Sequence, residues 1–158
     1  MNLQNAGRIK FSMEPVVYAG LDMAPTGQSA PPSFNVTLHA KSTYRWVTFC
    51  SSGQAMMAVT YSGVTFAMVD VEPFCVEPRG EKVITAAAST AWPVLPSVFQ
   101  ERMASDRRQG GIPVEVGFSF SNEKQVRPQA GQTWWVQCHT KLDADQPSTC
   151  KSHAVRGC

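Results

Sequence analysis

Charged side chains are scarce in this chain of 158 residues. Asp, Glu, Lys and Arg make up 16% of the sequence, and the formal net charge at pH 7 is only +2. A disordered chain has more charge and fewer apolar residues than the 43% found here. Nucleic-acid binding needs a larger basic surface than this charge provides. The basic cluster of Arg102, Arg107 and Arg108 is typical of a solvated helix face. The sequence therefore predicts a globular domain without a nucleic-acid partner.

The familiar signatures of catalysis and metal binding are also missing. The chain has no C-x-x-C, H-E-x-x-H or G-x-S-x-G motif and no glycine-rich phosphate loop. His39 and His139 are expected at outward positions of strands, as surface residues rather than catalytic bases, and His153 lies in the C-terminal tail. Asp143 and Asp145 are too few for a calcium loop. We therefore expect a protein that is not an enzyme and holds no metal or cofactor.

Long uniformly apolar runs are lacking as well. Residues 1–7 are polar and read as a flexible N-terminus without the apolar core of a signal peptide. The most apolar window, residues 55–71, contains Asp70 and has the period of strands. We predict neither a signal peptide nor a transmembrane helix.

Alternating apolar and polar residues are what the chain does have. A hairpin is predicted over residues 59–75, around a turn at Ser62 and Gly63, and Pro73 ends it because proline has no N–H for the ladder. The second strand of this hairpin is expected to place three side chains on one face: Val64, Phe66 and Met68. Further strands are predicted over residues 8–14, 16–21, 33–41, 44–50, 81–89, 112–121 and 133–142.

A single helix is predicted near residues 97–109. Ser97 and Gln100 have the spacing of a capping box, and the glycine pair at 110–111 ends the run. We expect this helix to lie across an open end of the sheets. The pattern predicts a mainly β fold: a two-sheet antiparallel β-sandwich, fibronectin- or immunoglobulin-like, with about seven strands over residues 8–142. Residues 143–158 read as a polar tail, poorly ordered except at Cys150.

Five cysteines occur in the chain, at positions 50, 75, 138, 150 and 158. Cys50 and Cys75 flank the hairpin, while Cys138 and Cys150 flank the end of the last strong strand. We predict the disulfides Cys50–Cys75 and Cys138–Cys150, with Cys158 left over, in an oxidising compartment. Five reduced, partly buried thiols are the alternative, because five cysteines do not fix a pairing.

Aromatic residues supply the candidate contact surface. Trp134 and Trp135 are consecutive on a strand, so one faces the core and the other faces outward. Four side chains are candidates for contact with a lipid or a partner: Trp134, Trp135, Phe118 and Phe120. Asn35 starts an N-x-T sequon at an outward strand position and is a candidate glycosylation site.

The order of these landmarks resembles the plant late embryogenesis abundant group-2 domain, in its harpin-induced and non-race-specific-disease-resistance-like branch. The resemblance covers about residues 8–142, and it depends on the order and spacing of loose motifs. The segments that carry it are Ala19-Gly-Leu-Asp22, Pro32-Ser-Phe-Asn-Val-Thr-Leu38, Tyr61-Ser-Gly-Val64, Glu72-Pro-Phe-Cys75, Arg107-Arg108 and Val114-Glu-Val116.

This resemblance implies a β-sandwich with one helix and no assigned enzymatic activity. It implies a place on the extracellular face of the plasma membrane, as the ectodomain of an anchored protein in responses to pathogens and stress. The leading hypothesis is thus a stress or defence domain that acts by contact with a protein or a cell-surface component. The alternative is a lipid-binding module with an apolar cleft between the sheets.

Overall fold

We describe the computed structural model of the chain over residues 8–21, 32–90, 95–122 and 132–156. These ranges form ten strands and one helix, and every strand pairing is antiparallel. The helix is α2 (Ser97–Arg108). The strands are β1 (Ile9–Met13), β2 (Val17–Ala19), β3 (Ser33–Ser42), β4 (Phe49–Tyr61), β5 (Val64–Val71), β6 (Cys75–Val76), β7 (Glu81–Ser89), β8 (Ile112–Asn122), β9 (Gln132–Leu142) and β10 (Ser148–Arg156). The predicted mainly β fold with one helix is confirmed.

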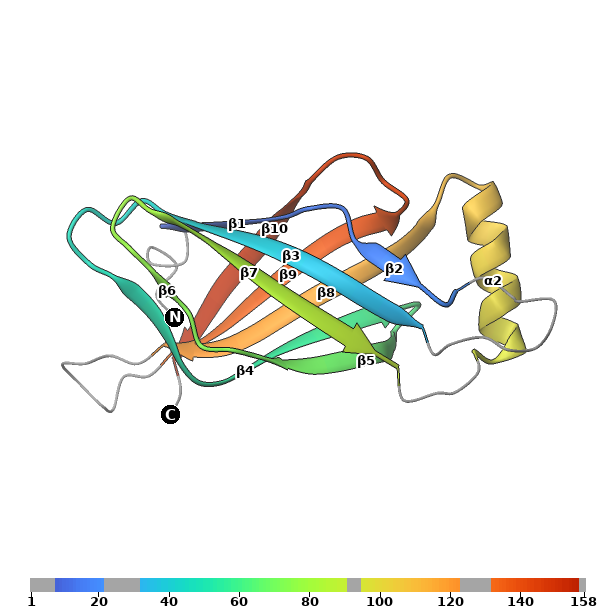
Figure 1. Ribbon diagram of the computed structural model, residues 1–158, viewed down its shortest axis with the longest axis horizontal. Helices are drawn as coiled ribbons and strands as arrows, with labels where there is room; N and C mark the ends of the chain where they lie inside the picture. The colour runs from blue at the N-terminus through green and yellow to red at the C-terminus, as the bar shows by residue number, and fades with distance from the viewer. Residues whose placement is uncertain (1–7, 22–31, 91–94, 123–131, 157–158) are drawn as a thin grey trace.

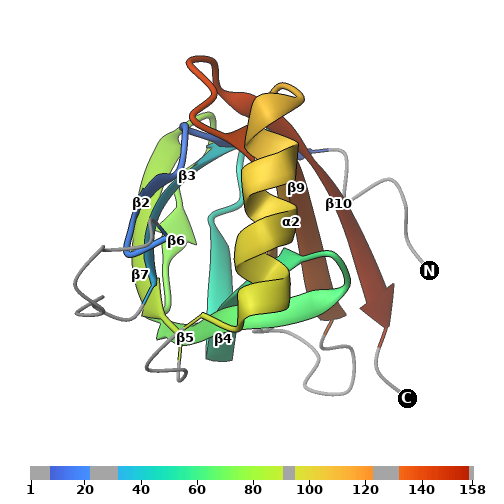
Figure 2. The ribbon, with the colours of Figure 1, turned by 90° about the vertical axis from the view of Figure 1, so that its right-hand side faces the viewer.

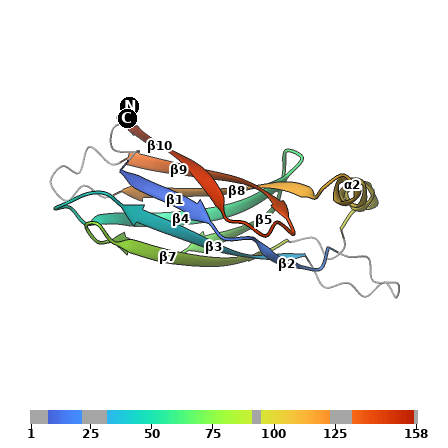
Figure 3. The same cartoon turned by 90° about the horizontal axis from the view of Figure 1, so that it is seen from above.

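The strands form a strongly curled sheet whose two halves face each other (Figures 1 and 2). In one half, β3 lies between β7 on one side and β1 and β2 on the other. The other half runs in the order β10-β9-β8-β4-β5. β1 and β10 join the halves, while β5 and β7 approach each other on the opposite side without a ladder between them among the described strands. Seen from above, the two halves are the layers of the predicted β-sandwich (Figure 3).

The interior follows from period-2 alternation. The inward side chains of β3 are at most 1% exposed, and those of β8 are at most 5% exposed. Both sets are the ones that the sequence predicts. They are Phe34, Val36, Leu38 and Ala40 on β3, and Ile112, Val114, Val116, Phe118 and Phe120 on β8.

The predicted hairpin is confirmed as β4 and β5, but its face assignment is wrong in one respect. Ser62 and Gly63 both have positive φ, 52° and 78°, the conformation of a type I′ turn that matches the twist of paired strands. Near this turn, the register between β4 and β5 shifts between Val59 and Thr60, which marks a β-bulge in the ladder. A bulge reverses the alternation, so Phe66 is 3% exposed whereas Met68 is 53% exposed.

Three further expectations are wrong. Residues 44–48 lie outside the strands, so the predicted strand over 44–50 reduces to the first two residues of β4. The C-terminal tail is not merely held at Cys150, because β10 inserts between β9 and β1 and completes the sheet. The capping box does not form, because Pro96 occupies the N-cap and the Gln100 amide donates to the Leu95 carbonyl instead.

Helix α2 lies across one end of the sandwich, as predicted (Figure 2). It buries Met103, and Phe99 lies edge-on to Phe66, with 5.1 Å between ring centroids. The helix also bonds to the hairpin, because the Tyr61 hydroxyl donates to the Asp106 carboxylate. Burial and this bond raise the pKa of Tyr61 well above its usual value. Among the described residues, no helix has the length and apolar character needed to cross a bilayer.

Candidate functional site

Both predicted disulfides are present, each between directly opposed residues of neighbouring strands. Cys50 on β4 pairs with Cys75 on β6, and Cys138 on β9 pairs with Cys150 on β10. The two sulfur atoms are 2.11 Å apart in the first pair and 2.06 Å apart in the second. Such bonds form and persist in oxidising compartments, so the chain suits an extracellular-type environment. Cys158 lies outside the described residues.

Three of the four candidate contact aromatics are core residues. Trp134 is fully buried, and its ring stacks on Phe120 and lies edge-on to Phe49. Phe118 and Phe120 are 4% and 3% exposed. The indole N–H of Trp134 is buried without a hydrogen-bond partner in the structure. These rings belong to the hydrophobic core between the layers and are not available for contact at the surface.

Trp135 is the outward member of the tryptophan pair, with 44% of its surface exposed. Its neighbours in the sheet are Ser119 on β8 and His153 on β10, and Met56 on β4 lies opposite Ser119. One row further along the sheet, exposed Met68 lies opposite Ala58. We name this surface the Trp135 face, defined by Met56, Ala58, Met68, Ser119 and Trp135. On this outer surface the apolar side chains alternate with polar ones, because Asp70 lies opposite Met56 and His153 lies opposite Trp135.

Asn35 is exposed on the other layer. It lies on β3 between Val17 of β2 and Ala87 of β7. A glycan on Asn35 would therefore leave the Trp135 face uncovered.

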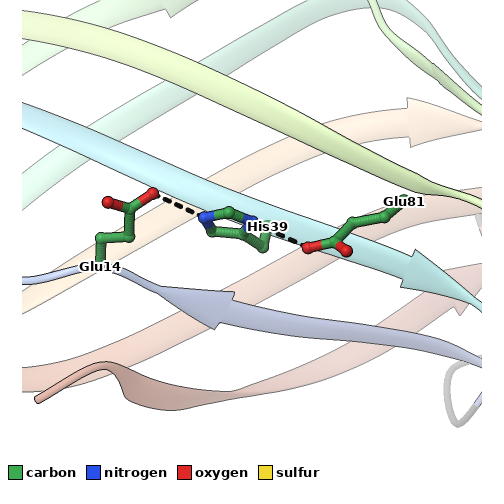
Figure 4. Close-up of polar contacts among 3 residues, drawn as sticks. All are labelled: Glu14, His39 and Glu81. Atoms are coloured by element: carbon green, nitrogen blue, oxygen red, sulfur yellow. Dashed lines mark hydrogen bonds and ion pairs between the residues drawn. The ribbon is translucent and has the colours of Figure 1, made fainter.

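His39 lies on that same outer surface of β3 and joins two carboxylates (Figure 4). Its Nε2 is 2.6 Å from Oε2 of Glu14, which follows β1 directly, and its Nδ1 is 2.8 Å from Oε1 of Glu81, the first residue of β7. The hydrogen bond to Glu14, and then the one to Glu81, raise the pKa of His39 above its usual 6.5. Because both ring nitrogens face carboxylate oxygens, the arrangement favours the doubly protonated imidazolium.

This cluster does not have the geometry of a nucleophilic triad. Ser12 of β1 is the cross-strand neighbour of His39. A general base needs one ring nitrogen free to accept the proton of a nucleophile, and both nitrogens of His39 are bonded to carboxylates. The cluster instead ties three strands together across the outer surface of the sheet. His139 lies on the outer surface of the other layer, opposite Glu115 of β8.

Two features of the surface were missed by sequence reasoning. The Glu14–His39–Glu81 cluster depends on the register of β7 and on the bend after β1, which the residue pattern does not give. The second is Trp46, which is 89% exposed in the loop between β3 and β4. It was missed because the sequence predicts a strand over residues 44–50. The polar residues Thr43, Arg45 and Thr48 around Trp46 are the signal in the sequence that favours a loop.

Within the described ranges, no group of three or more His, Cys, Asp or Glu side chains is arranged so that it could hold a metal ion. No family model matches the chain, and no curated protein matches it. A solved structure described as a protein from Archaeoglobus fulgidus is similar in outline. It is 13% identical, aligns over 82% of this chain and 97% of its own, and gives a TM-score of 0.42.

Proposed function

We propose that this chain is a non-enzymatic stress or defence domain outside the cytoplasm, acting by contact with a protein or a cell-surface component. The family resemblance supplies the biological setting of this proposal. The observation that carries the contact mechanism is the Trp135 face, where a half-exposed tryptophan and an exposed methionine share one outer surface.

The composition of this face suits contact. Tryptophan is enriched at interfaces because it offers a large apolar surface with a polar handle. Methionine adapts its shape to a partner. Ser119 lies between Trp135 and Met56 in the sheet, and its small side chain does not cover either of them.

The proposal includes attachment at the extracellular face of the plasma membrane and a glycan on Asn35. The membrane attachment follows from the resemblance and the glycan from the N-x-T sequon, and the exposed position of Asn35 is compatible with the glycan. Enzymatic deglycosylation of the secreted protein should lower its mass, and Asn35→Gln should abolish that change. An unchanged mass of the wild-type protein would remove the glycan from the proposal.

The decisive experiment is complementation in plants that lack the protein, with pathogen growth as the readout. Wild type should restore resistance, Trp135→Ala should not, and Val83→Ala, an exposed change on the outer surface of the other layer, should behave as wild type. Thiol counting on the unreduced secreted protein accompanies it, with at most one free thiol expected. Full complementation by Trp135→Ala, or five free thiols, would contradict the proposal.

A further inference from the structure

The end of the sandwich opposite α2 carries the most exposed large apolar side chain of the described residues. There the loop between β3 and β4 and the loop between β6 and β7 lie side by side (Figure 1). We name residues 43–48 and 77–80 the Trp46 tip. Trp46 is 89% exposed and Val47 is 57% exposed. A tryptophan exposes far more apolar surface than the neighbouring valine, so covering it would be favourable.

The tip is held in place by its backbone. The Arg79 amide donates to the Tyr44 carbonyl at 2.9 Å, and the Thr43 amide donates to the Arg8 carbonyl at 2.8 Å. Cys50 and Cys75 join the bases of the two loops covalently. The exposure of Trp46 is therefore a property of a braced loop and not of a fraying end.

Three arginines lie on or next to the Trp46 tip. Arg8, Arg45 and Arg79 are all exposed, and the Arg8 guanidinium lies 5.5 Å from the centre of the Tyr44 ring. The acidic residue of the tip, Glu77, accepts a bond from the Thr48 hydroxyl at 3.3 Å. The Trp46 tip thus combines a net positive charge with two exposed apolar side chains, Trp46 and Val47.

This combination favours a lipid surface over a protein partner. A specific protein interface buries about 800 Å² per partner, far more than one tryptophan and one valine offer. At a bilayer surface, by contrast, tryptophan inserts at the level of the headgroups, and guanidinium groups pair with phosphates at the same depth. We propose that the Trp46 tip docks on a phospholipid surface, with Trp46 and Val47 in the interface and Arg45 and Arg79 against the headgroup phosphates.

This inference adds a second contact surface to the proposed contact function and can fail separately from it. Vesicle binding tests the Trp46 tip alone, whereas complementation with Trp135→Ala tests the Trp135 face. The test uses the full chain with its disulfides intact, incubated with vesicles of phosphatidylcholine alone or with about a third phosphatidylserine. Co-sedimentation gives the partition coefficient, and brominated acyl chains report tryptophan insertion by quenching.

The wild-type protein should bind both kinds of vesicle, and Trp46→Ala should reduce partitioning about tenfold or more. Arg45→Gln and Arg79→Gln should each reduce it about fivefold, the equivalent of about 1 kcal/mol per charge, and this part should vanish in high salt. Val98→Ala, an exposed change on helix α2 at the opposite end of the sandwich, is the matched control and should stay within about twofold of wild type. Thermal unfolding of each variant verifies that it is folded.

Three outcomes would overturn the inference. The first is a wild-type protein that binds neither kind of vesicle. The second is binding that Trp46→Ala leaves unchanged while Trp135→Ala abolishes it. The third is a Trp46-dependent cross-link to a protein in the absence of vesicle binding, which would assign the tip to a protein partner.

Discussion

At one end of the sandwich α2 covers the interior with Met103 and Phe99, whereas at the other end two loops close by backbone bonds and a disulfide (Figure 1). The helix end therefore depends on side-chain burial. The Trp46 tip depends on main-chain and covalent bonds, which leaves its side chains available for contact. This difference implies that the exposed side chains of the tip can be changed without altering the fold, whereas changes to the buried side chains at the helix end reduce stability.

The strongest test of this contrast is Phe66→Ala. Phe66 is 3% exposed and lies between the Tyr61 and Phe99 rings, so its removal leaves a cavity beneath the helix. We expect a loss of about 3–5 kcal/mol in the free energy of unfolding, measured by urea denaturation. Val98→Ala on the exposed side of the same helix should cost less than about 0.5 kcal/mol. Equal costs would mean that the helix does not cover the core.

At the Trp46 tip, we expect the Cys50–Cys75 disulfide to contribute to the free energy of unfolding and the Trp46 side chain to contribute almost nothing. Replacing Cys50 and Cys75 together by alanine should cost about 3 kcal/mol, because the bond closes a separation of 25 residues. Trp46→Ala should change the free energy of unfolding by less than about 0.5 kcal/mol, since its side chain is almost wholly in water. Urea denaturation under non-reducing conditions measures both. A large loss from Trp46→Ala would show that the tip too depends on side-chain burial.

Tyr61→Phe removes the polar connection between the hairpin and the helix. Its hydroxyl donates to the Asp106 carboxylate, and loss of a bond to a charged group costs about 1.5–3 kcal/mol. Tyr18→Phe is the matched control, because the Tyr18 hydroxyl donates to Asp143 at an exposed site. We expect the control to cost less than about 1 kcal/mol in the same denaturation experiment. The reverse order would place the main polar tie on the surface rather than beneath the helix.

Much of this architecture follows from residue pattern because strand alternation is local. In the strands Ser33–Ser42 and Ile112–Asn122, the alternation of apolar and polar residues predicts which side chains are buried and which are exposed. The disulfides were predictable from position, since one cysteine pair flanks the predicted hairpin and the other flanks the end of the last predicted strand. The helix was found from its spacing, but the N-cap was not, because Pro96 already fixes the extended conformation that a cap residue needs.

The rest depends on long-range pairing. The polar segment of β10 becomes a strand because β9 and β1 offer it two ladders, and its own composition gives little sign of this. The bulge that exposes Met68 arises where β5 meets β4, and neither strand encodes it alone. The His39 cluster joins residues that are 25 and 42 positions apart, so only the registers of three strands bring them together.

The smallest expected effect is a pH dependence near the tip. Glu81 follows the tip directly, and its bond to His39, together with that of Glu14, raises the His39 pKa. The imidazolium therefore stabilises the fold fully below about 6.5, the ordinary value in an unfolded chain, and this contribution is lost as the pH rises through the raised value. Because all three side chains are partly exposed, the effect should stay below about 1 kcal/mol.

The groups around His39 decide how this test is built. On β1 and β3 the nearby charges are Lys10 and Lys41, which disfavour the imidazolium, while Ser12 and Val83 are its uncharged cross-strand neighbours. Urea midpoints at pH 5.5 and 8.5 should differ for the wild type and converge for His39→Gln. His139→Gln, on the outer surface of the other layer, should keep the wild-type difference. If His39→Gln retains it, the pH dependence has another source, and the three strands are held by their ladders alone.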